Sequence, residues 1–313
     1  FQTIEMYNVY RHSKNHEPVL VIATNTCNDI TGVLLAVIQT EHNGFLGSFT
    51  ARSIIWGGPL VKDNDLEVLD YILKEYNRLI KNKVIYTQFR NLWEWSFSEH
   101  NVFKSNGFLP IDHLDIIHDL SYDSDIILMN MNQGRRKNIK RAIKQNVIFE
   151  EISNREEFLS SLHLIVSTYN RIKLPLPDKT FFCEVYNELQ HIGMLKIFKV
   201  SFLNKMIGVR FVLCYKSLIY DWYAGASESD LDKYPNDLLP YKVMEWGHVN
   251  GYKFFDFGGA GKPNKAYGVR DYKLKFGGTL VNYGRYEAIH QPIKMSFAKT
   301  VFKGYRIIKG LFS

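Results

Sequence analysis

Residues 254–278, FFDFGGAGKPNKAYGVRDYKLKFGG, combine glycines and cations at an unusual density. Gly258 and Gly259 follow an apolar run, where glycine lets backbone amides approach a ligand closely or adopt positive φ. Five cations then fall within fourteen residues, opposed only by Asp271: Lys262, Lys265, Arg270, Lys273 and Lys275. This pattern favours a binding or transfer site, and the structural alternative is a glycine-rich connection with solvated lysines.

Several well-known site motifs are missing from the sequence. There is no Gly-x-Ser-x-Gly elbow, no paired histidine for zinc, no Cys-x-x-Cys, no Walker loop and no Gly-x-Gly-x-x-Gly after a strand. Covalent hydrolases, metalloenzymes and ATP-driven enzymes are therefore disfavoured, and we expect neither a metal nor a cofactor. Three widely spaced cysteines, Cys27, Cys183 and Cys214, are expected to be reduced core thiols.

A second cluster of charge lies in GRRKNIKRAIKQN, where residues 135–144 hold six cations and no acid. On a helix Arg136, Lys140 and Lys144 share one side. Arg135 and Arg136 are candidate phosphate ligands, because a guanidinium offers bidentate geometry that lysine lacks. A solvated basic face is an equally weighted interpretation.

A third candidate is the strand end formed by Asp221, Trp222 and Tyr223. Binding sites of α/β proteins form in the loops beyond strand ends, so these side chains are candidate substrate contacts. A core position for either aromatic residue is the structural alternative.

The elements that must position these residues follow two similar orders. In the first, a helix over 3–12 precedes strands at 19–23, 31–39 and 53–56, a helix over 65–82, a strand at 84–89 and a short helix over 102–109. In the second, a strand at 113–120 precedes a helix over 124–145, a strand at 147–152, a helical block over 155–189, strands at 194–201, 206–215 and 217–223, a helix over 237–250 and a strand at 254–257. The order predicts an α/β (α+β) fold with two mixed, mostly antiparallel sheets flanked by helices.

We place the domain boundaries at 1–112 and 113–285, with 286–313 as a basic amphipathic segment that packs back on the body. Residues 1–112 hold 10 Lys and Arg against 12 Asp and Glu, whereas residues 113–313 hold 29 against 20. The basic surface of the second part would attract nucleic acid, a nucleotide-linked substrate or anionic lipid. We expect a cytoplasmic protein, with contact at the inner face of the membrane as an alternative, and the oligomeric state is not predicted.

The order of RRKNIKRAIKQNV, WYAGAS, NDLLPYKVMEWGHVNGYKFFDFGGA and YGVRDYKLKFGG resembles the Fem family of peptidoglycan-bridge aminoacyltransferases and their GNAT-superfamily relatives. Residues 267–278 meet its Tyr-Gly-x-x-x-[Phe/Tyr]-Lys-x-x-Phe-Gly-Gly pattern. The resemblance implies two tandem GNAT-like domains and transfer of an amino acid from aminoacyl-tRNA to an amine of a cell-wall precursor.

The resemblance also implies roles for individual residues. Lys273 would stabilise the oxyanion that forms when an amine attacks an ester, and Tyr272 would line the donor channel. No covalent intermediate is required, and Asp221 or the substrate's own groups would serve as the base. The remaining candidate substrate contacts are Trp222, Tyr223, Gly258, Gly259, Tyr267, Arg270, Lys275, Arg135 and Arg136.

Two departures from the family pattern leave the donor open. The helical block contains Pro175 and Pro177 in place of a long helical arm, and the usual GNAT pyrophosphate signature is replaced by LDKYPNDLLP. One alternative function is acyl transfer from acyl-CoA or an acyl carrier to an amino sugar in surface-polysaccharide synthesis. Another is an inactive GNAT pair that binds nucleic acid or anionic lipid.

Overall fold

The computed structural model describes residues 1–41 and 50–296, and the chain divides into two compact units. The first unit contains residues 1–112 and the chain from residue 283 onward, and the second contains residues 113–282. The expected division at 285 differs from this, because residues 285–289 form a strand of the first sheet. Residues 297–313, most of the expected amphipathic segment, lie outside the described residues.

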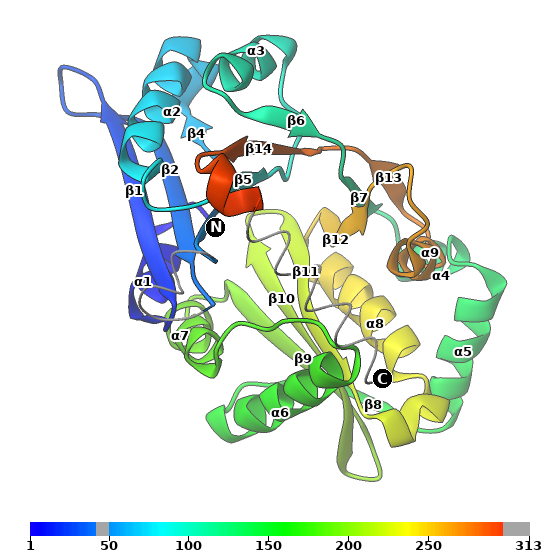
Figure 1. Ribbon diagram of the computed structural model, residues 1–313. Coiled ribbons are helices and arrows are strands. Elements are labelled where there is room, and N and C mark those ends of the chain that lie inside the picture. The colour runs from blue at the N-terminus through cyan, green and yellow to red at the C-terminus, as the bar shows by residue number, and fades with distance from the viewer. Residues whose placement is uncertain (42–49, 297–313) are drawn as a thin grey trace. The chain divides into compact units, whose positions relative to one another are not determined.

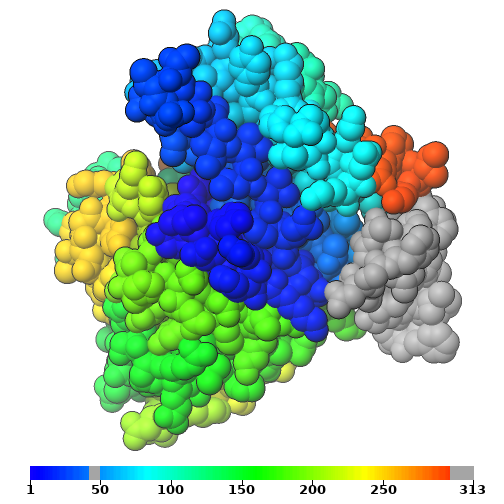
Figure 2. Space-filling view, turned by 90° about the vertical axis from the view of Figure 1, so that its left-hand side faces the viewer, coloured from blue at the N-terminus to red at the C-terminus, as the bar shows by residue number. Residues whose placement is uncertain are grey.

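The first unit is built on one mixed sheet with the strand order β1-β2-β3-β5-β14-β6, and β4 pairs with β2. Strands β3 and β5 run parallel. Helix α1 packs on β1, and α2 packs on β1 and β2 (Figure 1). Residues of this unit, in blue and cyan, form the upper and central part of the surface in Figure 2. The described elements are α1 (Ile4–His12), β1 (His16–Thr24), β2 (Ile30–Gln39), β3 (Arg52–Trp56), β4 (Leu60–Val61), α2 (Leu66–Ile80), β5 (Tyr86–Arg90), α3 (Phe97–Ser105), β6 (Leu109–Ile111) and β14 (Arg285–Ile289).

Helix α2 shows why the sequence folds this way locally. The side chain of Asp65 caps its first turn by accepting hydrogen bonds from the backbone N–H groups of Glu67 and Val68. Its apolar residues recur at three- and four-residue steps, so they all lie on the side that faces the sheet. The buried residues are Leu69, Ile72, Leu73, Tyr76 and Ile80.

The second unit is built on a sheet with the strand order β13-β7-β12-β11-β10-β9-β8. Strands β11 and β12 run parallel, and the other neighbouring strands run antiparallel. Its described elements are β7 (Leu114–Asp119), α4 (Ser124–Met129), α5 (Gln133–Lys144), β8 (Ile148–Glu151), α6 (Arg155–Arg171), α7 (Lys179–Leu189), β9 (Leu195–Phe202), β10 (Lys205–Tyr215), β11 (Leu218–Ala226), α8 (Pro235–Val249), β12 (Phe254–Gly261), α9 (Gly268–Leu274) and β13 (Thr279–Val281).

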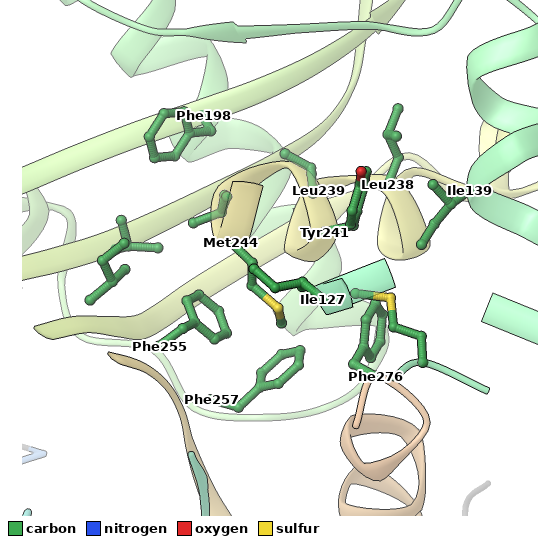
Figure 3. Close-up of a cluster of buried hydrophobic side chains, with 14 of the residues drawn as sticks. Ile127, Ile139, Phe198, Leu238, Leu239, Tyr241, Met244, Phe255, Phe257 and Phe276 are labelled. Carbon is green, nitrogen blue, oxygen red and sulfur yellow. The ribbon is translucent and has the colours of Figure 1, made fainter. Parts of the chain in front are cut away.

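Helices cover both faces of this second sheet. On one face, α8 inserts Leu238, Leu239 and Met244 against strand residues such as Phe255 and Phe257 (Figure 3). On the other face, α6 and α7 pack their aromatic residues on β10, so that the ring centroids of Phe158 and Phe182 lie 6.0 and 6.4 Å from that of Phe211. Phe158, Phe182 and Phe211 are all almost fully buried. Each face therefore has its own apolar layer.

Two predicted elements differ from the structure. The helix expected over 124–145 is two helices, because Asn132 accepts a hydrogen bond from the N–H of Arg135 and so caps the start of α5. Strand β12 continues through the glycines to Gly261, where the sequence predicted a loop, and Gly259 pairs with Asp115 of β7. Among the three cysteines, Cys214 is buried as expected, whereas Cys27 is exposed.

Over residues 1–41 and 50–296, no helix has both the length and the apolar character needed to cross a membrane.

The close contact between Gly225 of β11 and the backbone of α6 can be tested by substitution. A Cβ added at Gly225 would lie 2.9 Å from backbone atoms of Leu164 and Ile165, which cannot rotate away. Gly225→Ala should therefore lower the free energy of unfolding by about 1 to 3 kcal/mol in urea denaturation. Gly134→Ala, where the nearest atom would lie 3.5 Å away, should leave stability unchanged or slightly higher. Equal stability of the two variants would contradict this packing.

Candidate functional site

Strands β11 and β12 pair over only three residues and then separate. The paired residues are Leu218, Ile219 and Tyr220 of β11 with Phe254, Phe255 and Asp256 of β12. Beyond them β11 continues to Ala226 and β12 to Gly261, but the two strands no longer pair with each other. At the point of separation β11 also has a bulge. Val212 pairs with Asp221 and Phe211 with Tyr223, so Trp222 is the extra residue. Bulges of this kind occur beside active sites, where they redirect side chains.

Lys273, on the short helix α9, reaches the separated part of β12. Its Nζ donates hydrogen bonds to the carbonyl oxygens of Phe257 at 2.6 Å, Gly258 at 3.2 Å and Gly259 at 3.0 Å. Gly258 has a φ of +70°, which favours glycine at this position. A lysine ammonium has three hydrogen-bond donors, and here all three are used by β12. We call the unpaired ends of the two strands, together with Lys273, the wedge.

The positive charge of Lys273 lies within a buried ionic cluster. Arg210 of β10 donates from Nη1 to Asp221 Oδ2 at 2.6 Å, and the two side chains are 4% and 11% exposed. Asp256 is 1% exposed and accepts a hydrogen bond from the N–H of Gly258 at 2.7 Å. Asp115, also buried, acts electrostatically on Lys273. Two cations and three carboxyl groups thus converge at the wedge.

Burial shifts the pKa values of these groups toward their neutral forms. It raises the pKa of Asp256 to about 6, against the opposing effects of the Gly258 N–H and Lys273. It also raises the pKa of Asp221, opposed by Arg210 and Lys273, and lowers the pKa of Lys273, opposed by Asp221, Asp256 and Asp115. In the described residues Asp221 Oδ1 is buried without a hydrogen-bond partner. That oxygen is a free proton acceptor inside the site.

Tyr272 of α9 and Arg135 of α5 both contact the first turn of α8. The hydroxyl of Tyr272 donates to the carbonyl of Asn236 at 2.6 Å, and the guanidinium of Arg135 lies 4.4 Å from the centre of its ring. Arg135 forms an ion pair with the buried carboxylate of Asp237, in the first turn of α8. The structure thus gives Arg135 an acidic partner within the protein, which the sequence interpretation did not include.

The aromatic candidates on β11 lie against α6 and α7. The ring of Tyr223 lies 4.9 Å from that of Phe182 and 5.8 Å from that of Tyr169, and the ring of Trp222 lies 5.6 Å from that of Phe181. Burial raises the pKa of Tyr169 to about 12, and Asp221 acts in the same direction. Tyr169 therefore brings a neutral hydroxyl to the Asp221 side of the wedge.

The other predicted site residues lie farther out. Arg270 donates to the carbonyls of Lys262 at 2.8 Å and Lys265 at 2.6 Å, so it closes its own loop. Tyr267 is 40% exposed and Lys275 is also exposed. Arg136 is half-buried, with one contact to the carbonyl of Met129 at 3.4 Å. The structure thus brings together Asp221, Gly258, Gly259 and Lys273, and it leaves Arg136 and Lys275 outside the wedge.

The sequence interpretation missed Arg210, Asp256, Asp115 and Tyr169. A usable signal was present for the first two, since each is a lone charge within an apolar strand, in MIGVRFVLCY and FFDFGG. A buried charge is tolerated only when it is paired, so such a residue indicates a partner nearby in the fold.

Residues 133–274, which include the wedge, match the family model described as an acetyltransferase (GNAT) domain. Over these residues the second unit is similar to GNAT acetyltransferase domains. A sequence search of curated proteins gives no match.

Three solved structures share the fold across both units. FemX is 16% identical, with a TM-score of 0.75 over 95% of this chain and 94% of that chain. The C-terminal domain of a putative lysylphosphatidylglycerol synthetase from Agrobacterium fabrum is 12% identical, with a TM-score of 0.60 over 95% and 94%. A tandem GNAT protein from the clavulanic acid biosynthesis pathway is 8% identical, with a TM-score of 0.53 over 91% and 87%. These likenesses confirm the fold predicted from the sequence, two tandem GNAT-like domains.

Replacing Lys273 tests its place in the wedge. Lys273→Met leaves three carbonyl oxygens without their donor and buried carboxylates without their cation, so the free energy of unfolding should fall by about 3 to 5 kcal/mol. Lys275→Met, at an exposed position two residues along, should change it by less than about 0.5 kcal/mol. Urea denaturation measures both, and a Lys273→Met protein as stable as the control would show that Lys273 is not fixed in the wedge.

The raised pKa of Asp256 predicts a pH dependence of stability. Because the folded protein holds this proton more tightly than the unfolded chain does, the contribution of Asp256 is complete below pH about 3.8. It is lost as the pH rises through about 6. The side chain in Asp256→Asn stays neutral at every pH. The free energy of unfolding of wild type relative to this variant should therefore fall by about 1 to 3 kcal/mol between pH 4 and pH 7. Carboxyl ¹³C NMR should give a midpoint near 6, and a midpoint at or below 3.8 would contradict the burial of this group.

Proposed function

We propose that this chain is an aminoacyltransferase that moves an aminoacyl group from aminoacyl-tRNA to an amine of a cell-wall (peptidoglycan) precursor by direct attack. The observation that carries the proposal is the wedge, where two strands stop pairing beside a buried cluster of fixed charges, in residues similar to a GNAT acetyltransferase domain. In this reaction the amine nitrogen forms an amide bond with the acyl carbon, and the ester bond to the tRNA ribose breaks. No nucleophile of the protein is needed.

The wedge suits stabilisation of the tetrahedral intermediate of this reaction. Beyond Tyr220, the backbone groups of β11 that face β12 have no strand partner in the described part of the sheet. Backbone N–H groups held in a rigid strand are the usual donors of an oxyanion hole. We assign the oxyanion to this edge of β11, next to the bulge at Trp222.

Lys273 would support the same intermediate without contacting it. Its three donors are already used by β12, so a direct bond to an oxyanion would cost one of them. We therefore assign Lys273 as a positioning residue, which fixes the separated carbonyls and contributes a positive potential. Asp221 Oδ1, without a hydrogen-bond partner among the described residues, is the proposed acceptor for the proton that the attacking amine loses.

The start of α8 supports a donor other than coenzyme A. A helix N-terminus attracts phosphates through its free N–H groups and its dipole. Here Pro235 occupies the first helical position, and the carboxylate of Asp237 lies in the first turn, paired with Arg135. Pro235 has no N–H, and the N–H groups of Asp237 and Leu238 already donate to the carbonyl of Tyr234, so this helix start offers few donors to a pyrophosphate and the proposal favours aminoacyl-tRNA.

The second candidate is acyl transfer from acyl-CoA or an acyl carrier to an amino sugar in surface-polysaccharide synthesis. The description of the matched family as an acetyltransferase favours it. In both reactions an amine attacks an activated acyl carbon, so the same wedge would serve either one.

A transfer assay with radiolabelled aminoacyl-tRNA and radiolabelled acetyl-CoA, run side by side with amine acceptors, separates the two. We expect label from aminoacyl-tRNA to reach the acceptor, and Asp221→Asn should lower this rate by about 100- to 10,000-fold, the range for loss of a general base. Tyr122→Phe, at an exposed position, serves as the unaffected control. Turnover of acetyl-CoA alone would overturn the proposed donor, and turnover of neither would favour an inactive binding protein.

A further inference from the structure

Helix α5 presents a row of cations to solvent. Lys137, Lys140, Arg141 and Lys144 are all exposed, while Ile139 and Ala142 are fully buried beneath them. The helix contains no acid. Like charges three and four residues apart repel one another on a helix, so this face is unfavourable in the free protein. Its stability comes instead from the Asn132 cap and the buried residues.

These cations lack the acidic partners that three other lysines of this unit have. Lys196, Lys205 and Lys242 pair with Glu151, Asp230 and Glu245. Within the described part of the chain, by contrast, no ion pair involves the four cations of α5. Arg141 donates a hydrogen bond to the hydroxyl of Tyr234 at 3.1 Å, which orients it without neutralising it.

The basic row is also joined firmly to the wedge. At the start of α5 the N–H of Asn132 donates to the carbonyl of Lys275 at 2.9 Å, just after α9. The half-buried Arg135, which lies over Tyr272, is two residues before Lys137, the first exposed cation of the row. From Lys137 to Lys144 the row extends about 10 Å at the rise of an α-helix, which spans several phosphates of one nucleic acid strand.

We propose that the exposed face of α5, formed by Lys137, Lys140, Arg141 and Lys144, binds the phosphate backbone of the RNA whose aminoacyl end enters the wedge. This inference rests on the proposed aminoacyl-tRNA donor and names where the rest of that donor is held. Contacts from lysine and arginine to phosphates position a protein on a nucleic acid and carry no sequence information, so this binding is expected to be independent of RNA sequence.

The composition of the face favours RNA over a membrane. An interfacial helix buries a broad apolar side among lipids and keeps its cations at the edge. In α5 the apolar residues Ile139 and Ala142 are already in the protein core, and Ile143 at 49% exposure is the apolar residue on the outside. The outer face therefore offers charge without an apolar surface to insert.

The test compares two variants of the full chain with the same loss of three charges. Lys137→Gln/Lys140→Gln/Lys144→Gln removes cations from the basic row, and Lys205→Gln/Lys216→Gln/Lys253→Gln removes exposed lysines elsewhere in the same unit. Fluorescence anisotropy with deacylated tRNA, over a series of salt concentrations, gives the affinity and its salt slope. Thermal unfolding checks that both variants are folded.

We expect the α5 variant to bind tRNA at least ten-fold more weakly at low salt, with a salt slope smaller by about 2 to 3, since each phosphate contact contributes about 0.9. In the transfer assay its KM for aminoacyl-tRNA should rise while kcat stays within two-fold. The control variant should match wild type in both.

Other results would overturn the inference in distinguishable ways. Equal tRNA affinity of the α5 variant and the control would reject the surface while leaving the transferase proposal intact. Loss of binding to phosphatidylglycerol vesicles, with tRNA binding unchanged, would assign the face to a membrane. If wild type transfers nothing from aminoacyl-tRNA and does not bind deacylated tRNA, both proposals fail. If it binds tRNA through α5 without transfer, only the proposed reaction fails.

Discussion

Strands β11 and β12 separate after three paired residues, and the carbonyl groups that this frees on β12 must find donors inside the protein. Lys273 supplies all three donors from a single ammonium. The ammonium of Lys273 therefore carries a positive charge into the protein interior. A buried charge is tolerated only when groups of opposite charge lie nearby. Asp221, Asp256 and Asp115 provide them, and Arg210 balances Asp221 in turn. The opening of the sheet thus determines which charged residues collect around it.

The two sheets show that this opening is specific to the second unit. In the first unit the parallel strands β3 and β5 pair residue by residue from Arg52 with Tyr86 to Trp56 with Arg90, without a bulge. Thr87 and Ser53 there meet the hydroxyl of Tyr76, at 2.9 and 2.7 Å, in a buried neutral network. A similar arrangement of strands thus carries neutral hydroxyls in one unit and ionised groups in the other. The proposed transfer chemistry is therefore assigned to the second unit, where these two strands separate.

Much of the fold follows from local sequence, and much of the site does not. The three- and four-residue spacing of α2 and the fold class were readable, and the structure brings Gly258, Gly259 and Lys273, which the sequence singled out, together in the wedge. The ion pair of Arg135 with Asp237 was not predicted, because Asp237 lies 102 residues later in the chain and no local sequence pattern indicates the pair. The bulge at Trp222 and the hydrogen bonds of Lys273 likewise depend on contacts between distant strands. Local pattern identifies which residues are unusual, while the tertiary fold decides whether each one faces a partner or a substrate.

A lysine whose three donors are already used can still matter for catalysis. An exposed ammonium must lose bound water and change its position as charge develops in the transition state. An ammonium fixed by three carbonyl groups is already oriented, so the free-energy cost of reorganisation is small.

The electrostatic effect of Lys273 at the β11 edge depends on the charges around it. With Asp256 ionised at neutral pH, the acids offset much of the field of Lys273 and Arg210, and with Asp256 protonated, below about pH 6, the wedge becomes more positive. Asp221 has the opposite requirement, because it can accept a proton only while it is ionised. The ion pair with Arg210 favours the carboxylate of Asp221 and so opposes part of the upward pKa shift that burial causes. A single buried cluster can therefore provide both a positive field for an oxyanion and a base for an amine, provided that Asp256 and Asp221 lose their protons at different pH values.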